Sequence, residues 1–278
     1  MKMKLKDFNN KHLGETVYII GCAPTLNNLS EREINFLNNS TTIGVNFSHL
    51  KIKLKYWIGG HIEQAVFALE SNLPYNVPLF AHCDERVRYV TQVWDSDRII
   101  PVNASMPKLP LSRHADEKED LAGATSIVLS AIHLAYIMGA SKVVFVGFEG
   151  KNASHFYTTD EVLRKYTVRK IKQIMLSGKY WSNINYGHSV PFFNVHQAFE
   201  VMLGGHDLYG HFAEKESLEE SDLTYFGKDD EVGNRNRDDI KNYVSFLNKN
   251  NIVTYTREKE GMLADTDSII VDDLRTIE

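Results

Sequence analysis

The stretch VYIIGCAPTLNNL at residues 17–29 decides the fold. Val17 to Ile20 form a short, β-branched apolar run with the length of a buried parallel strand. Gly21 ends it before Pro24 and Thr25 lead into a polar stretch, which predicts strand, tight turn and helix. Such a turn directs backbone N–H groups at an anion above the sheet edge, and phosphate is the obvious candidate. A turn with a structural role alone explains these residues equally well, because the G-x-G-x-x-G dinucleotide fingerprint is absent.

Composition narrows the class of protein. The chain of 278 residues is long enough for one large α/β domain or two small ones, and its 43% of hydrophobic residues can fill a sizeable core. The formal net charge of -5 argues against sequence-independent nucleic-acid binding, which needs a basic surface. Cys22 and Cys83 are too few for a disulfide framework, and no apolar run reaches about 20 residues, so we expect a cytoplasmic protein. The basic start MKMKLK is compatible with peripheral contact with an anionic membrane.

Strand-like and helix-like stretches alternate along the first half of the chain. This pattern predicts an α/β, Rossmann-like fold with a mostly parallel sheet and helices on both faces. Further strands are predicted at TTIGVN (41–46), KYWIGG (55–60), VPLFAH (77–82) and RIIPVN (98–103), and a loop between Ala104 and Asp120. We expect one nucleotide-binding domain over residues 17–260, with tails at 1–16 and 261–278.

Residues 122–150 give the clearest unit. Apolar residues recur at helical spacing over 127–138, Gly139 stands where a C-cap glycine belongs, and KVVFVG (142–147) is a buried strand. Thr125 and Ser126 stand at the start of this helix, where hydroxyls cap the N-terminus and could also contact a phosphate or ribose.

The alternation of strand-like and helix-like stretches stops in residues 151–190, which are rich in aromatic and basic side chains. We expect a lid excursion after a central strand, where open α/β sheets bind ligands. Further helices are predicted at 195–205 and within 237–258, where a strand follows. His188, in NYGHSV (185–190), is a candidate general base because imidazole titrates near neutral pH.

In order and spacing, four segments resemble the bacterial sialyltransferases of glycosyltransferase family 42. They are IIGCAPTL (19–26), GVNFS with Asn46, GATSIVLSAIHLAYIMGASKVVFVGFE (123–149) and YGHS (186–189). They are also similar to a wider group that includes motility-associated glycosyltransferases and archaeal hydroxymethyldihydropterin pyrophosphokinases. The resemblance covers roughly residues 17–200.

The resemblance implies roles for the residues that match. The turn that holds the CMP part of the donor is matched by Gly21, Pro24 and Thr25, whereas Cys22 and Ala23 replace the family's Asn and Gly. Asn46 matches a residue that contacts the nucleotide, Thr125 and Ser126 match residues against phosphate and ribose, and His188 matches the general base.

Two departures concern the donor phosphate. Where the family has two lid tyrosines, this chain has Lys151, His155 and Tyr157, which could also donate to a departing phosphate. The family's Arg before the Thr-Ser pair has no counterpart. Glu149, followed by His155, fits the wider group somewhat better.

Two other patterns could suggest metal sites. Asp95 and Asp97 form a D-x-D motif, but it precedes its strand, and we favour a solvated turn. His206 and His211 lack a third ligand at a recognisable spacing, so we predict no metal site there.

These observations predict a glycosyltransferase that moves a sugar, most simply a sialic-acid-like sugar on CMP, to a glycan or other hydroxyl acceptor without an obligatory metal. One alternative is a pyrophosphokinase-like enzyme that uses ATP and Mg²⁺, with Glu149 holding the metal. A nucleotide-binding protein without catalysis is another. The sequence does not define the oligomeric state.

Overall fold

The computed structural model describes residues 3–60, 62–71, 73–74, 76–82, 97–105, 109–115, 120–123, 126–148, 156–176, 231–261 and 263–277. Across these residues, nine strands form one sheet in which all neighbouring strands run parallel. In spatial order they are β6 (Asp120–Ala122), β5 (Ile99–Ser105), β4 (Leu79–His82), β3 (Tyr56–Gly59), β2 (Thr41–Val45), β1 (Thr16–Ile20), β7 (Lys142–Val146), β8 (Val253–Thr256) and β9 (Ile269–Ile270).

The order of the strands reverses at β1. The chain builds outward from β1 to β6, returns to place β7 against the other side of β1, and continues outward to β9. The boundary between β1 and β7 is therefore the topological switch point of the sheet. The predicted α/β, Rossmann-like fold is confirmed, and the predicted strands at 41–46, 55–60, 77–82 and 98–103 correspond to β2, β3, β4 and β5.

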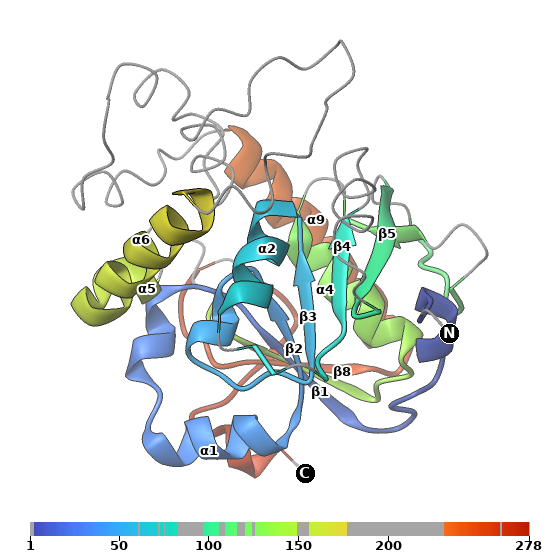
Figure 1. Cartoon of the computed structure of the whole chain (residues 1–278). Helices are drawn as coiled ribbons and strands as arrows, with labels where there is room; N and C mark the ends of the chain where they lie inside the picture. Colours follow the sequence, from blue (N-terminus) through green and yellow to red (C-terminus); the bar gives the residue numbers. More distant parts are fainter. Residues whose placement is uncertain are drawn as a thin grey trace.

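Helices cover both faces of the sheet (Figure 1). On one face, α1 (Glu31–Asn39) packs on β2, and α2 (Ile62–Glu70) packs on β3 and β4. On the other, α4 (Ile127–Ile137) packs on β1, β2, β3 and β6, with α9 (Glu231–Lys249) beside it. All residues of α4 from Val128 to Ile137 are buried, because the helix lies between the sheet and α9. Gly139 follows with a φ of 83°, which confirms the predicted glycine cap.

The central strands are apolar on both sides. Val17, Ile19 and Ile20 in β1 are fully buried, as are Val143 to Phe145 in β7. A parallel strand covered by helices on both faces has this continuous apolar sequence rather than an alternating one. Burial of these two strands holds the turns at their carboxyl ends in fixed positions.

Within the segments predicted as tails, 1–16 and 261–278, several of the described residues pack into the fold. The short 3-10 helix η1 (Leu5–Phe8) buries Leu5 and Phe8, and the ring of Phe8 lies 4.9 Å from that of Phe80. Near the C-terminus, β9 adds to the sheet, and η5 (Leu274–Thr276) buries Leu274. Apolar residues at both ends therefore join the core.

Part of the predicted lid is packed helix. Residues 156–176 form α5 (Phe156–Thr159) and α6 (Glu161–Leu176). Here α5 packs on the 3-10 helix η2 (Pro24–Asn28), and α6 packs on α2. The N–H of Phe156 donates to the carbonyl oxygen of Cys22 at 2.9 Å, so α5 is attached to the β1 turn. Residues 151–155 and 177–190 of the predicted lid, and the predicted helix at 195–205, lie outside the described residues.

None of the helices that the structure describes is long and apolar enough to cross a membrane.

Candidate functional site

The carboxyl ends of the parallel strands meet at one edge of the sheet. The turns that follow β2, β1, β7 and β8 are neighbours along this edge, because their strands are neighbours. Open parallel sheets bind ligands here, beside the point where the strand order reverses. The structure thus brings two predicted groups, the turn Gly21–Thr25 and Asn46, into adjacent turns.

The β1 turn lies directly against the β7 turn. The N–H of Gly21 donates to the carbonyl oxygen of Val146 at 2.8 Å, and the N–H of Ala23 donates to that of Gly147 at 3.0 Å. A Cβ atom at Gly21 would lie 2.1 Å from the Gly147 oxygen. The close approach of two backbones therefore requires glycine at this position. Pro24 opens η2, where its missing N–H loses no helical hydrogen bond.

A carboxylate from the turn after β8 links the turns after β1 and β7 by hydrogen bonds. The Oε1 atom of Glu258 accepts hydrogen bonds from the N–H of Gly147 at 2.8 Å, the N–H of Phe148 at 3.2 Å and the hydroxyl of Thr25 at 3.1 Å. The side chain of Glu258 is buried, with 3% of the residue exposed. Thr25, predicted to face the nucleotide, thus has its hydroxyl proton directed at the protein itself.

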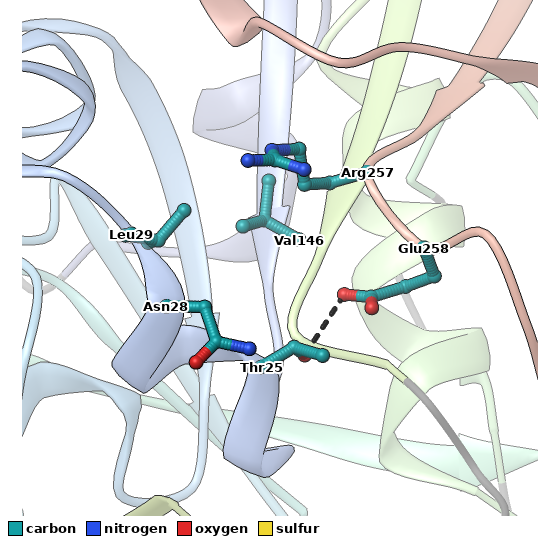
Figure 2. Close-up of a pocket in the computed structure, with 6 residues that line it drawn as sticks. All are labelled: Thr25, Asn28, Leu29, Val146, Arg257 and Glu258. Atoms are coloured by element: carbon teal, nitrogen blue, oxygen red, sulfur yellow. Dashed lines mark hydrogen bonds between the residues drawn. The ribbon is translucent and has the colours of Figure 1, made fainter.

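Beside this carboxylate lies a small hollow lined by Thr25, Asn28, Leu29, Val146, Arg257 and Glu258 (Figure 2). Its volume of about 60 Å³ has room for a few waters or a small ion, not for a nucleotide. Arg257 lies on the far side of the hollow from Asn28, and its Nε donates to Oε1 of Glu33 at 3.1 Å.

Cys22 joins the β1 turn to the β2 turn. Its thiol donates to the carbonyl oxygen of Val45 at 3.3 Å and is buried. Burial raises the pKa of the thiol to about 12, although hydrogen bonds from the backbone N–H groups of Phe47 and Ser48 oppose the rise. Cys22 is therefore a neutral thiol that packs between the β1 and β2 turns.

Asn46 follows β2 in the left-handed region, with a φ of 48°. Asparagine tolerates this conformation better than most residues. Its carbonyl oxygen accepts from Trp57 Nε1 at 2.6 Å and from His49 Nδ1 at 3.1 Å, which fixes the backbone. Its side-chain oxygen Oδ1 is buried and has no hydrogen-bond partner within the described structure. Among the described residues, Asn46 Oδ1 is therefore an acceptor without a donor, and a second acceptor of this kind lies three residues further along the chain.

That second acceptor is Nε2 of His49, which the sequence analysis did not identify. A carbonyl can only accept, so Nδ1 carries the proton in its bond to Asn46, and Nε2 is left as an acceptor. Nε2 is also buried without a partner in the described part of the chain. Burial lowers the pKa of His49 to about 4, so the ring is neutral at pH 7. Phe47 and Phe67 pack against the ring.

The structure also describes Ser126 and Tyr157, two further residues of the predicted site, and both make contacts within the protein. The hydroxyl of Ser126 caps α4 by accepting from the N–H of Val128 at 3.4 Å. Tyr157 has 1% of its surface exposed, and its ring lies 5.0 Å from that of Phe47. Burial raises the pKa of Tyr157 well above 10. In this arrangement Tyr157 packs in the core against Phe47.

Several predicted residues lie outside the described part of the chain: Thr125, Glu149, Lys151, His155 and His188, together with Asp95, His206 and His211. Asp97 is described and exposed. Within the described residues, no group of three or more His, Cys, Asp or Glu side chains could hold a metal ion.

No protein-family model matches the chain, and a search of curated proteins finds no significant relative. The resemblance to the sialyltransferases therefore remains a prediction from the sequence.

Proposed function

We propose that the chain binds a nucleotide-activated sugar along the carboxyl edge of its sheet and transfers the sugar to a glycan or another hydroxyl acceptor. The nucleotide is CMP, as the sequence resemblance implies. One observation carries the proposal: Asn46 and His49 present two buried acceptors without donors at the end of β2, next to the β1 turn.

Unpaired buried acceptors are costly, because each loses its hydrogen bonds to water and gains none from the protein. A ligand that supplies donors removes this cost. A nucleoside has donors of this kind in its ribose hydroxyls and, in cytosine, its exocyclic amine. The backbone of Asn46 is held by two hydrogen bonds, so the position from which its side chain extends is set before a ligand arrives. The backbone at this position therefore loses no further freedom on binding.

In the proposed reaction, His188 takes the proton of the acceptor hydroxyl as this oxygen attacks the anomeric carbon. The bond from that carbon to the CMP phosphate breaks, and Lys151 and His155 donate to the departing phosphate. Tyr157 was predicted to share this task. Its burial against Phe47 favours a packing role, so the proposal leaves the phosphate to the other two residues.

Thermal unfolding with a panel of nucleotides tests the binding step. CMP, CTP, UDP, GDP and ATP are each added with and without Mg²⁺, and the midpoint temperature is measured. A ligand at 100 times its dissociation constant stabilises the native state by about 2.7 kcal/mol. We expect CMP and CTP to raise the midpoint most, with no need for Mg²⁺. A shift with ATP and Mg²⁺ alone would instead favour a pyrophosphokinase, and no shift with any nucleotide would contradict the proposal.

A further inference from the structure

Three donors converge on a single atom, Oε1 of Glu258. Two are the successive backbone N–H groups of Gly147 and Phe148, and the third is the hydroxyl of Thr25. The backbone of Glu258 is held in turn, because its N–H donates to Oγ1 of Thr256 at 3.1 Å. The carboxylate is thus the common partner of the turns after β1 and β7.

Successive N–H groups in a turn form a concave nest that binds anions. Hydrogen bonds to an ionised acceptor are stronger than those between neutral groups. In open α/β sheets, N–H groups at the switch point commonly receive a phosphate of the ligand. In this chain the equivalent donors are already engaged by a buried carboxylate of the same chain.

We infer that the N–H groups of Gly147 and Phe148 and the hydroxyl of Thr25 form an anion site, and that Glu258 is its resident anion and keeps phosphate out of the switch point. The part of the inference that concerns the nucleotide rests on the proposed function. The existence of the anion site does not.

The hydroxyl of Thr25 has one proton to donate, which limits the kind of ligand group that Thr25 can bind. Oε1 of Glu258 also accepts the N–H groups of Gly147 and Phe148, and Thr25 donates its only hydroxyl proton to the same oxygen. Towards a ligand, Oγ1 of Thr25 can then only accept. Asn46 Oδ1 and His49 Nε2 are acceptors as well. These three acceptors therefore suit ligand hydroxyls and amines, which belong to the nucleoside, rather than its phosphate.

Replacing Glu258 with alanine would empty the site and leave its three donors buried. The hollow of about 60 Å³ beside Glu258 adds to the space that the lost side chain leaves. A small anion from solution can then take the place of the carboxylate. The probes are sodium acetate and sodium phosphate, with sodium chloride at equal ionic strength as the reference.

The experiment measures the midpoint of thermal unfolding of Glu258→Ala in each salt. The controls are the wild-type chain and Glu260→Ala, which removes an exposed carboxylate from the same turn. We expect acetate and phosphate to raise the midpoint of Glu258→Ala by roughly 2–4 °C over chloride, and to leave both controls unchanged. Equal midpoints for Glu258→Ala in all three salts would overturn the inference, and so would a phosphate shift of equal size in the wild-type chain.

If Glu258→Ala does not fold in chloride, its refolding is measured in acetate and in chloride. Recovery of folded protein in acetate, and not in chloride, supports the inference, whereas no recovery in either salt, with Glu260→Ala refolding in both, overturns it. None of these measurements uses a nucleotide. Failure of the wild-type chain to bind CMP would therefore contradict the proposed function, while the acetate result decides the anion site.

Discussion

The carbonyl oxygen of Gly147 occupies the position that a side chain at Gly21 would need, since a Cβ atom there would lie 2.1 Å away. The same oxygen accepts the N–H of Ala23 at 3.0 Å, so it cannot turn aside without loss of that bond. The two turns at the switch point are therefore locked together by backbone contact. Any ligand at this edge binds against a rigid base.

Gly21→Ala should lower the free energy of unfolding by about 1–3 kcal/mol or more, because the added methyl group forces the two turns apart. Gly60→Ala is the matched control. Gly60 follows β3 at the same edge, and the nearest atom to its added Cβ is His82 Nδ1 at 4.0 Å. Denaturant unfolding of both variants measures the difference. An equal loss of unfolding free energy in the two variants would show that the contact between Gly21 and Gly147 does not exclude a side chain at position 21.

His49 should make stability depend on pH. Its pKa is about 4 in the folded protein, below the ordinary histidine value of 6.5, so the unfolded chain binds the extra proton first as pH falls. The stability that the neutral ring contributes is complete above pH 6.5. It is lost as pH falls towards 4, by up to about 1.4 kcal/mol per pH unit and about 3 kcal/mol in all.

The variant His49→Phe keeps a ring between Phe47 and Phe67 and removes the titration. Unfolding free energies at pH 7, 6 and 5 should therefore fall less steeply in His49→Phe than in the wild-type chain. Parallel curves for the two proteins would exclude His49 as a source of the acid sensitivity.

Asn46→Gly should weaken nucleotide binding. Glycine accepts a φ of 48° without strain, so the variant removes the side-chain amide and leaves the backbone free to keep its conformation. Loss of a hydrogen bond to a buried acceptor costs about 1 kcal/mol or more, which is at least a fivefold rise in the dissociation constant of CMP. Calorimetric titration gives that constant.

Asn251→Gly is the control for Asn46→Gly. Asn251 is also left-handed, with a φ of 62°, but it is exposed and lies in the turn before β8. It should bind CMP as the wild-type chain does. If Asn46→Gly also binds CMP normally, its unpaired oxygen is not part of the binding site.

Much of the fold could be predicted because its signals are local. Apolar runs in the sequence predict β1 to β5 and β7, and the helical spacing of apolar residues before Gly139 predicts α4. Two short edge strands, β6 and β9, were not predicted. They have three and two residues, and strands this short carry little periodicity. Their place in the sheet depends on neighbouring strands rather than on their own sequence.

The site could be predicted only in part, because its contacts join distant segments. Glu258 meets Thr25 across 233 positions of sequence, and this contact requires β8 to lie next to β7, which no local pattern reveals. Tyr157 is buried because α5 packs on η2, also a tertiary event. Asn46 was identifiable from its place after a strand. Its left-handed backbone belongs to a turn that hydrogen bonds from Trp57 and His49 complete, and these contacts are tertiary.

The most direct test of the proposed function is the release of CMP from a CMP-linked, sialic-acid-like sugar in the presence of a glycan acceptor. The wild-type chain should release CMP and form the glycosylated product. His188→Ala should lower this turnover by roughly 10²–10⁴-fold and leave the dissociation constant of CMP unchanged, because a general base acts on the acceptor rather than on the donor. His114→Ala, which changes an exposed histidine, should retain full turnover. Absence of product with the wild-type chain, or full turnover by His188→Ala, would contradict the account.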